Sequence, residues 1–319
     1  MLQTTIHVSS PAKINLFLHV TGQRQDGYHT LESLMLPISL CDQITLTIQP
    51  KPEGHSLTFS KSGDLNHLAD DIDLTVRACQ QFFHAASVSP HYHIHLHVTK
   101  HIPEQAGLGG GSSNAAHTLT ALQNHFNQPL STSHLQEIAL SLGADVPFFL
   151  QSQAAFIEGI GEHLTPLNWP SLPLIIYKPP QNCPTHQIFR AKQLTRNKTT
   201  VKIAVFDLLQ IINTELSNTG ATTKIEKSTN LGARHLNFWQ FLNQHTENSL
   251  QSVISELEPS WLSQFNVFKS LMQSKQPLLV RMSGSGSAMF AVFENNLLQQ
   301  QAFKLTQHLP GQVFCCHTQ

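Results

Sequence analysis

The feature that most constrains this sequence is a glycine-rich loop between a predicted strand and a predicted helix. Residues 93–98 alternate between histidine and aliphatic side chains, which is typical of a strand with one buried face. The loop, residues 107–111, reads GLGGG, and residues 112–126 have the pattern of a helix. Glycine lets a backbone approach a ligand closely, and a helix N-terminus offers free N–H groups to an anion. A phosphate-binding loop is therefore favoured over the alternative, a flexible Gly/Ser linker.

Charged residues are scarce, and this limits how the chain could hold an anion. The 319 residues include 19 lysines and arginines, 20 aspartates and glutamates and 20 histidines, with a net charge of −1. No basic surface for a nucleic-acid polymer is expected, because such binding depends on many phosphate-neutralising cations. A phosphate ligand would be held locally, by backbone N–H groups and a few lysines. The loop matches neither the GxxxxGK[ST] nor the GxGxxG pattern.

Three histidines, His93, His95 and His97, share one face of the strand predicted over 93–98. They could chelate a metal, but side chains two positions apart on a strand lie about 6.6 Å apart and converge poorly on one ion. A polar strand face is the preferred interpretation.

The cysteine count and the N-terminal sequence indicate a cytoplasmic protein. The five cysteines are odd in number and lack CxxC spacing, so neither a disulfide framework nor a zinc ribbon is expected. No signal peptide is evident, and no run approaches the roughly 18 apolar residues of a membrane span.

The order of the predicted elements indicates an α+β (mixed α/β) protein. Further strands are predicted at 14–20, 43–48, 172–177, 278–282 and 288–293, and further helices at 71–86 and 135–142. The length suggests two domains at about 150 residues each.

Prolines near position 166 punctuate the chain, so we predict an N-terminal domain over 1–165 and a C-terminal domain over 166–319. Residues 195–235 are largely polar around an apolar stretch at 203–212. We interpret them as an insertion that contains one helix.

Six short motifs stand in a defined order along the chain. They are PAKINLFL (11–18), DGYHTLESL (26–34), KHIPEQAGLGGGSSNAA (100–116), LGADVPFF (142–149), AAFIEGIGE (154–162) and RMSGSGSAMFAVF (281–293). Taken singly they are weak: Lys13 alone is more often a solvated lysine, and Asp145 alone a turn or cap residue. In this order the sequence resembles the GHMP kinases, over most of the chain outside 195–235.

The resemblance implies a two-domain fold, with an N-terminal domain like ribosomal protein S5 domain 2 and a C-terminal domain of ferredoxin-like type. It also implies that the γ-phosphoryl group of ATP passes to a hydroxyl of a cytidine diphosphate-linked polyol, a step of isoprenoid precursor synthesis. Asp145 would be the general base, and Lys13 beside it would stabilise charge on the transferring group.

The resemblance also implies how the nucleotide is held. The expected ATP contacts are Lys100, Pro103, Gly107, Leu108, Gly109, Gly110, Gly111, Ser112 and Ser113. Residues 283–287 would support this loop from the second domain. Mg²⁺ is expected from the chemistry of ATP, with no protein ligand assigned.

On the substrate side, the resemblance implies that Tyr28 and Phe189 stack on the two faces of cytosine and that His29 hydrogen-bonds its edge. Asn15 and Thr185 would complete the polar contacts. The alternatives are a homoserine- or mevalonate-type kinase of the same family, and a non-catalytic nucleotide or sugar sensor. The aromatic pair favours cytosine over the other alcohols, and retention of a base and its lysine argues against a sensor.

We expect small-molecule partners alone, with no nucleic-acid polymer and no membrane, and a monomer or homodimer. Three positions depart from the family pattern. Asp73 stands where the family usually has Asn, on the adenine side, and Met35 replaces a frequent aromatic. Glu104 adds negative charge near the expected triphosphate, so we expect it to point outward.

Overall fold

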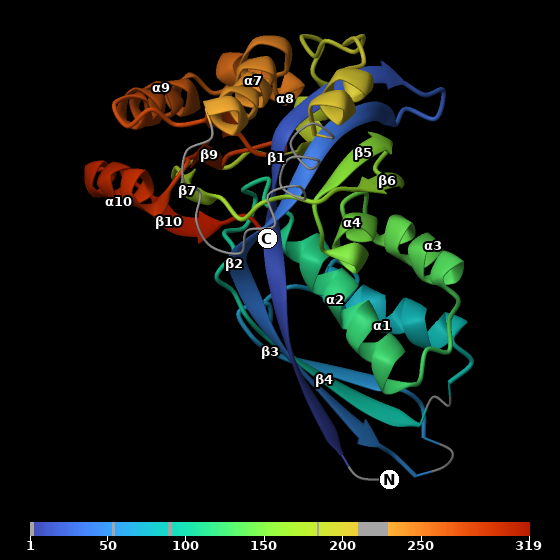
Figure 1. Ribbon diagram of the computed structural model, residues 1–319. Helices are drawn as coiled ribbons and strands as arrows, with labels where there is room; N and C mark the ends of the chain where they lie inside the picture. The colour runs from blue at the N-terminus through green and yellow to red at the C-terminus, as the bar shows by residue number, and fades with distance from the viewer. Residues whose placement is uncertain (1–2, 53–54, 89–90, 184, 210–228) are drawn as a thin grey trace.

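The computed structural model describes residues 3–52, 55–88, 91–183, 185–209 and 229–319. Two β-sheets, each packed with helices, make up the molecule (Figure 1). The first is six-stranded, in the order β3-β4-β2-β5-β6 with β1 paired to β2, and the second is four-stranded, in the order β10-β7-β9-β8. This arrangement confirms the predicted α+β class.

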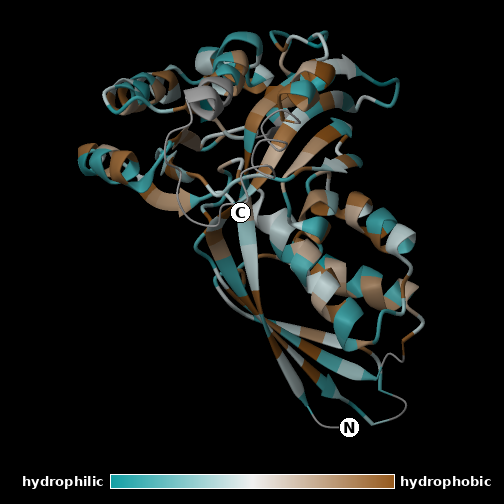
Figure 2. Cartoon of the chain, in the orientation of Figure 1, coloured by the Kyte–Doolittle hydropathy of each residue, from teal (hydrophilic) through white to brown (hydrophobic). Residues whose placement is uncertain are grey.

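A long antiparallel hairpin of β1 (Thr4–Gln23) and β2 (His29–Pro50) runs through the molecule (Figure 1). Residues 4–9 of β1 alternate in exposure, so this end has one solvated face. The hydropathy of the residues also varies along this part of the hairpin (Figure 2). Residues 10–20 are buried without interruption because both halves of the molecule pack against them. The strands predicted at 14–20 and 43–48 are parts of this hairpin.

In the N-terminal half, β4 (Tyr92–Thr99) pairs antiparallel with β2 and parallel with the edge strand β3 (Thr58–Gly63). On the other side of β2 lie β5 (Ala155–Gly159) and β6 (His163–Pro166). The helices of this half lie on one side of the sheet (Figure 1): α1 (Leu74–Ala85), α2 (Gly110–His125), α3 (Thr132–Leu142) and α4 (Val146–Gln151). Their apolar faces meet the aliphatic face of β4 in one core.

The second sheet contains β7 (Pro173–Lys178), β8 (Leu279–Met282), β9 (Met289–Val292) and β10 (Gln312–His317). The helices of this half are α5 (Thr185–Arg190), α7 (Thr229–His245), α8 (Ser249–Leu257), α9 (Pro259–Gln273) and α10 (Asn296–Leu305). Every residue of β7 is buried, since the strand is covered on both faces. None of the described helices has the length and apolar character needed to cross a bilayer.

The histidines of β4 form a hydrogen-bonded ladder with the hydroxyls of β3. Neighbouring hydroxyl oxygens and ring nitrogens lie 2.8–2.9 Å apart, in the order Thr58, His93, Ser60, His95, Ser62, His97. Both nitrogens of His93 and of His95 are therefore engaged by hydroxyls. This is the polar strand face that the sequence predicts.

The segment before the predicted insertion helix is bound to the hairpin. Residues 202–209 are helical, and the remainder of the helix expected over 203–212 lies outside the described residues. The backbone N–H of Lys198 donates to Val20 O at 3.1 Å, and that of Val201 donates to the Glu32 carboxylate at 3.0 Å. The Thr200 hydroxyl also donates to Glu32. The predicted domain boundary near 165 and the insertion over 195–235 stay predictions.

Candidate active site

A cavity of about 560 Å³ lies where the two halves meet, a size typical of small-molecule sites. Its wall includes the glycine-rich loop, one face of the β1–β2 hairpin and the turn before α4, with Phe189, Leu250, Gly284 and Ser285 from the C-terminal half. The predicted site residues that line it are Lys13, Asn15, Lys100, Pro103, Gly107, Leu108, Gly109, Gly110, Gly111, Ser112, Asp145 and Phe189. Segments far apart in sequence thus share one cleft.

The conformation of the loop requires glycine at two positions. Gly107 and Gly109 have φ values of 73° and 74°, in the left-handed region. A Cβ atom on Gly107 would lie 2.2 Å from Ser283 O, and one on Gly109 would lie 2.8 Å from the Phe149 ring. Gly109 is the N-cap of α2 and brings no side chain to that end, so the first N–H groups of the helix are left for an anion.

Residues of the second domain hold this loop in place. The Ser283 hydroxyl donates to Gly107 O at 3.1 Å, and the backbone N–H of Ala288 donates to Ala106 O at 3.0 Å. The N–H of Ser287 donates to Gln105 O at 3.3 Å. The contact expected from residues 283–287 is therefore present, and the loop depends on both halves of the molecule.

Lys13 and Asp145 meet in the cavity. Lys13, on β1, is 3% exposed, and its Nζ donates to Asn15 Oδ1 at 2.7 Å. The same Nζ lies 3.5 Å from Asp145 Oδ2. Asp145 is the N-cap of α4, but its side chain makes no capping hydrogen bond and is 35% exposed. Its carboxylate is therefore free to act on a bound ligand.

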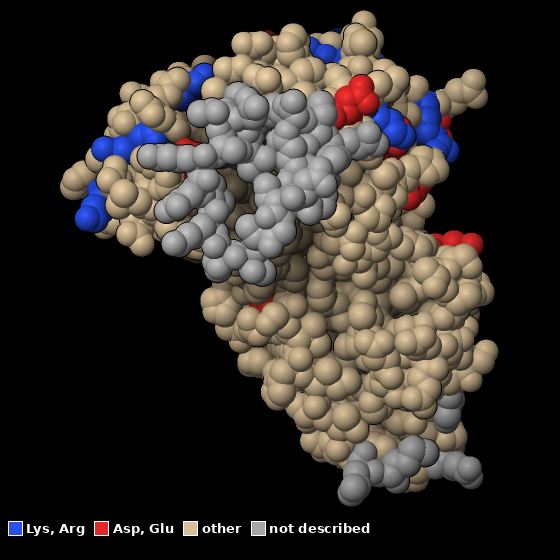
Figure 3. Space-filling view, in the orientation of Figure 1, with Lys and Arg blue, Asp and Glu red and all other residues tan. Residues whose placement is uncertain are grey.

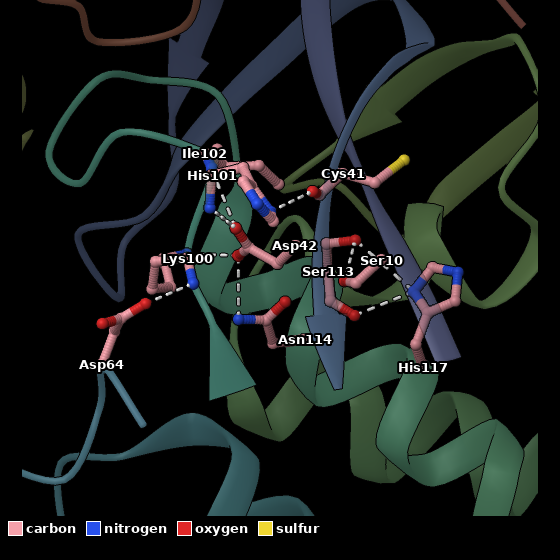
Figure 4. Close-up of polar contacts among 10 residues, drawn as sticks. All are labelled: Ser10, Cys41, Asp42, Asp64, Lys100, His101, Ile102, Ser113, Asn114 and His117. Atoms are coloured by element: carbon pink, nitrogen blue, oxygen red, sulfur yellow. Dashed lines mark hydrogen bonds and ion pairs between the residues drawn. The ribbon is translucent and has the colours of Figure 1, made fainter. Parts of the chain in front are cut away.

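Lys100 forms a second ion pair, with Asp42 (Figure 4). Asp42 is completely buried, and its carboxylate also accepts the backbone N–H groups of His101 and Ile102, each at 2.8 Å, and Asn114 Nδ2 at 3.1 Å. The carboxylate thus joins the middle of β2, the segment before the loop and the first turns of α2. Lys100 lines the cavity with its charge already balanced.

Comparisons with known proteins agree with this geometry. A family profile for the GHMP kinases N terminal domain matches residues 73–153. Over 297 residues the chain is 37% identical to the 4-diphosphocytidyl-2-C-methyl-D-erythritol kinase of Polaromonas naphthalenivorans (strain CJ2), covering 91% of this chain and 86% of that protein. The chain belongs to the 4-diphosphocytidyl-2-C-methyl-D-erythritol kinase family, within the GHMP kinases. Kinases of this family use ATP as co-substrate.

Solved structures support the same assignment. A crystal structure of 4-(cytidine 5'-diphospho)-2C-methyl-D-erythritol kinase superposes with a TM-score of 0.71 at 28% identity, covering 98% of this chain and 99% of that one. A homoserine kinase from Cytophaga hutchinsonii reaches a TM-score of 0.67 at 14% identity, covering 98% and 94%, which shows the shared fold alone. The resemblance to GHMP kinases and the two-domain fold that it implies are confirmed.

Within this kinase fold, Ser113 is the predicted ATP contact that does not line the cavity. It is fully buried, its hydroxyl accepts from the Ser10 hydroxyl at 2.7 Å, and its carbonyl accepts from His117 Nδ1 at 2.9 Å (Figure 4). Its placement therefore supports packing of α2 against β1 and lends no support to the predicted ATP contact. Glu104 is exposed but still contributes to the cavity wall, so it does not point wholly away.

Asp73, which stands where the family usually has Asn, has two partners in the structure. Its Oδ1 caps α1 by accepting the N–H of Thr75 at 2.9 Å, and its Oδ2 lies 3.4 Å from Lys61 Nζ. Asp73 lines the cavity together with the apolar residues Leu65, Leu68 and Ile72. Sequence reasoning missed Lys61 and this apolar wall, because neither stands in a recognisable motif.

The predicted cytosine contacts are less completely assembled. The His29 and Phe189 rings lie 5.4 Å apart at 40°. Tyr28 is 60% exposed in the turn between β1 and β2, and neither Tyr28 nor His29 lines the cavity. The side chain of Thr185 lies outside the described residues. Burial and the charge of Arg196 both lower the pKa of His29. Sequence reasoning did not anticipate the contact between Arg196 and His29.

Proposed function

We propose that the chain transfers the γ-phosphoryl group of ATP to the 2-hydroxyl of 4-diphosphocytidyl-2-C-methyl-D-erythritol, giving the 2-phosphate and ADP in isoprenoid precursor synthesis. The names of its relatives support this substrate. The observation that carries the proposal is the Lys13–Asp145 pair, which lies in the same cavity as the glycine-rich loop, with the carboxylate open to a ligand.

In the proposed reaction, Asp145 accepts the proton of the substrate hydroxyl. The hydroxyl oxygen forms a bond to the γ-phosphorus, the bond from that phosphorus to the β–γ bridging oxygen breaks, and ADP leaves. Lys13 stabilises the negative charge on the transferring group, and the 2.7 Å hydrogen bond to Asn15 holds its ammonium in position. General-base assistance of this kind contributes about 10²- to 10⁴-fold to the rate.

The nucleotide would be held by the backbone at the start of α2, with Ser112 and Lys100 nearby. Mg²⁺ fits this setting, since Mg²⁺ in kinases is commonly bound by substrate phosphates, waters and one or two protein oxygens. Of the side-chain oxygens that line the cavity, we assign this role to those of Asp145 and Ser112. When bound, Mg²⁺ would neutralise phosphate charge.

At the wall formed by Phe189, this residue would stack on the cytosine and the adjoining His29 ring would hydrogen-bond its edge. Tyr28 would cover its second face, and Asn15 and Thr185 would add polar contacts. The 5.4 Å approach of the His29 and Phe189 rings supports this half of the proposal. The exposure of Tyr28 leaves its ring available to a ligand.

A coupled assay of ADP release with three alcohols tests the proposed function. We expect turnover with 4-diphosphocytidyl-2-C-methyl-D-erythritol and background rates with homoserine and mevalonate. The Asp145→Asn variant, prepared identically, controls for contaminating ATPase activity. Turnover of homoserine or mevalonate in place of the cytidylated alcohol would overturn the substrate assignment, and ATP binding without any turnover would favour a sensor.

We also propose that the protein is cytoplasmic and that it is a monomer or a homodimer. All five cysteines are free thiols, which suits a reducing compartment. Size-exclusion chromatography with light scattering would distinguish a monomer of 35.5 kDa from a dimer.

A further inference from the structure

Arg196 joins the two elements that carry the predicted cytosine contacts. Its Nε donates to His29 Nε2 at 2.9 Å. One terminal nitrogen donates to Leu194 O at 3.0 Å, and the other to Phe189 O at 3.2 Å and Ala191 O at 3.0 Å. One planar side chain therefore binds both the end of α5 and the first residue of β2.

The direction of the hydrogen bond to His29 fixes the state of the imidazole. A guanidinium has only N–H donors, so His29 Nε2 must be the acceptor and the ring proton must be on Nδ1. A second proton, on Nε2, would point an N–H donor of His29 at the N–H donor of Arg196 and would bring two positive charges together. The lowered pKa of His29, caused by burial and by Arg196, agrees with a neutral ring. In the described part of the chain, Nδ1 of His29 makes no hydrogen bond, so its N–H is available to a ligand.

The same contacts set the position of Phe189. This residue lines the cavity, and its carbonyl is one of the groups that Arg196 holds. The ring of Phe189 and the ring of His29 are thereby kept 5.4 Å apart, in reach of one flat ligand. Neither Arg196 nor His29 is among the residues that line the cavity, so Arg196 acts on a ligand only through Phe189, which lines it, and through His29, whose ring contacts that of Phe189.

We propose that Arg196 is a positioning residue for base recognition, which holds His29 as a neutral Nδ1–H donor beside Phe189. This inference rests on the proposed function, because it assigns the pair to the pyrimidine of the substrate. A donor at Nδ1 recognises an acceptor on the base edge, and cytosine presents O2 and N3.

Replacing Arg196 should separate binding of the cytidylated substrate from the chemistry. In Arg196→Met we expect KM for that substrate to rise about 10- to 100-fold, with kcat and KM for ATP within about threefold of wild type. In Arg196→Lys we expect KM to rise less than in Arg196→Met, because an ammonium can make some, but not all, of the forked contacts of a guanidinium. Lys198→Met is the matched control: this lysine stands two residues away and pairs with Glu247 at 2.7 Å, so its loss should leave KM unchanged.

The state of His29 can be measured directly by ¹⁵N NMR of the imidazole nitrogens, with its signals identified by their loss in His29→Gln. We expect the Nδ1–H form in the wild type and loss of that single form in Arg196→Met. Binding of cytidine 5'-diphosphate, measured by calorimetry, should weaken in parallel. If Arg196→Met does not fold, the signals and cytidine 5'-diphosphate binding of Arg196→Gln decide instead.

Different results would overturn the role of Arg196 and the proposed kinase reaction. An Nε2–H or charged His29 in the wild type, or an unchanged KM in a folded Arg196→Met protein, would overturn the role of Arg196 even if the kinase reaction is observed. Absence of turnover with cytidine 5'-diphosphate binding and the Nδ1–H signal intact would overturn the proposed reaction alone.

Discussion

Two lysine–aspartate pairs lie at the same cavity, and they differ in what else the carboxylate touches. Asp42 is completely buried and accepts four donors, from Lys100, Asn114 and two backbone N–H groups. Asp145 is 35% exposed, its single ion-pair contact is the one with Lys13 at 3.5 Å, and no other hydrogen bond to it is present in the described residues.

The difference separates a structural carboxylate from a chemical one. Every lone pair of Asp42 that faces the protein is used, so this group cannot take a proton from a substrate without breaking the contacts that hold the loop. Asp145 has unused lone pairs toward the cavity. The number of donors around a carboxylate is thus as informative as its distance to a lysine.

The largest expected effect is on turnover in Asp145→Asn. An amide cannot act as the base, so kcat should fall about 10²- to 10⁴-fold while ATP affinity and the melting temperature stay near wild type. Steady-state assays with ATP titration calorimetry measure both. Retained turnover would remove Asp145 from the chemistry.

The opposite result is expected for Asp42→Asn. Losing one partner of a buried ion pair leaves Lys100 uncompensated, so the free energy of unfolding should fall by about 3–5 kcal/mol. Urea denaturation measures this change, with Asp145→Asn as the matched comparison: that carboxylate is 35% exposed and 3.5 Å from Lys13, which keeps its hydrogen bond to Asn15. A stable Asp42→Asn protein with the kinetic defect of Asp145→Asn would show that the two pairs are not distinct.

A smaller effect is expected in the loop between the pairs. Gly109→Ala puts a Cβ at positive φ, 2.8 Å from the Phe149 ring and 3.2 Å from Lys13 Cγ, so KM for ATP should rise about tenfold. In Gly111→Ala the nearest protein atom is 3.7 Å away, an ordinary contact, and φ is not positive, so we expect a smaller rise in KM for ATP than in Gly109→Ala. Equal effects would argue against a conformational requirement at Gly109.

The smallest effect is on stability in mild acid. Burial is the main cause that lowers the pKa of His19, His29 and His117 below 6.5. The folded state therefore favours the neutral rings, so their contribution is complete above about pH 6.5 and declines as the pH falls through the lower folded pKa values. We expect the melting temperature to fall by a few degrees between pH 7 and 5.

A substitution at His117, on α2, tests which histidine causes this acid sensitivity. Nδ1 of His117 lies 2.9 Å from Ser113 O and its Nε2 lies 3.2 Å from the Ser152 hydroxyl, which donates to Phe149 O at 2.8 Å, and burial lowers the pKa of the ring. His117→Gln should flatten the pH dependence of the melting temperature. An unchanged pH profile would assign the acid sensitivity to the other histidines.

Much of the fold could be predicted because it depends on local patterns. The alternation in 93–98, the glycines at 107–111 and the helix of 112–126 each reflect interactions over a few residues. The edge strand β3 was missed because TFSKSG has no clear periodicity, and it is a strand through its pairing with β4. Such pairing is a tertiary property.

For the site, the motifs located Lys13, Asp145 and the loop, but not the groups that support them. Arg196 and His29 are 167 positions apart, and no local rule relates them. The burial of Ser113 could not be predicted from spacing, since Ser112 also lies one helical turn before a fully buried alanine, Ala115, and yet lines the cavity. The scarcity of charged residues predicted that an anion would be held locally. On the face that Figure 3 shows, charged side chains lie mainly over the upper part of the molecule.

The ladder between β3 and β4 has one further consequence. Lys51 Nζ donates to Thr58 Oγ1 at 3.1 Å at one end. The arrangement that then uses every hydrogen points each hydroxyl at the next Nδ1, which makes His93, His95 and His97 the same tautomer. Every hydrogen bond in the row then runs in the same direction, from Lys51 toward His97. Three histidines that do not line the cavity therefore form one cooperative unit beside the edge strand of the sheet.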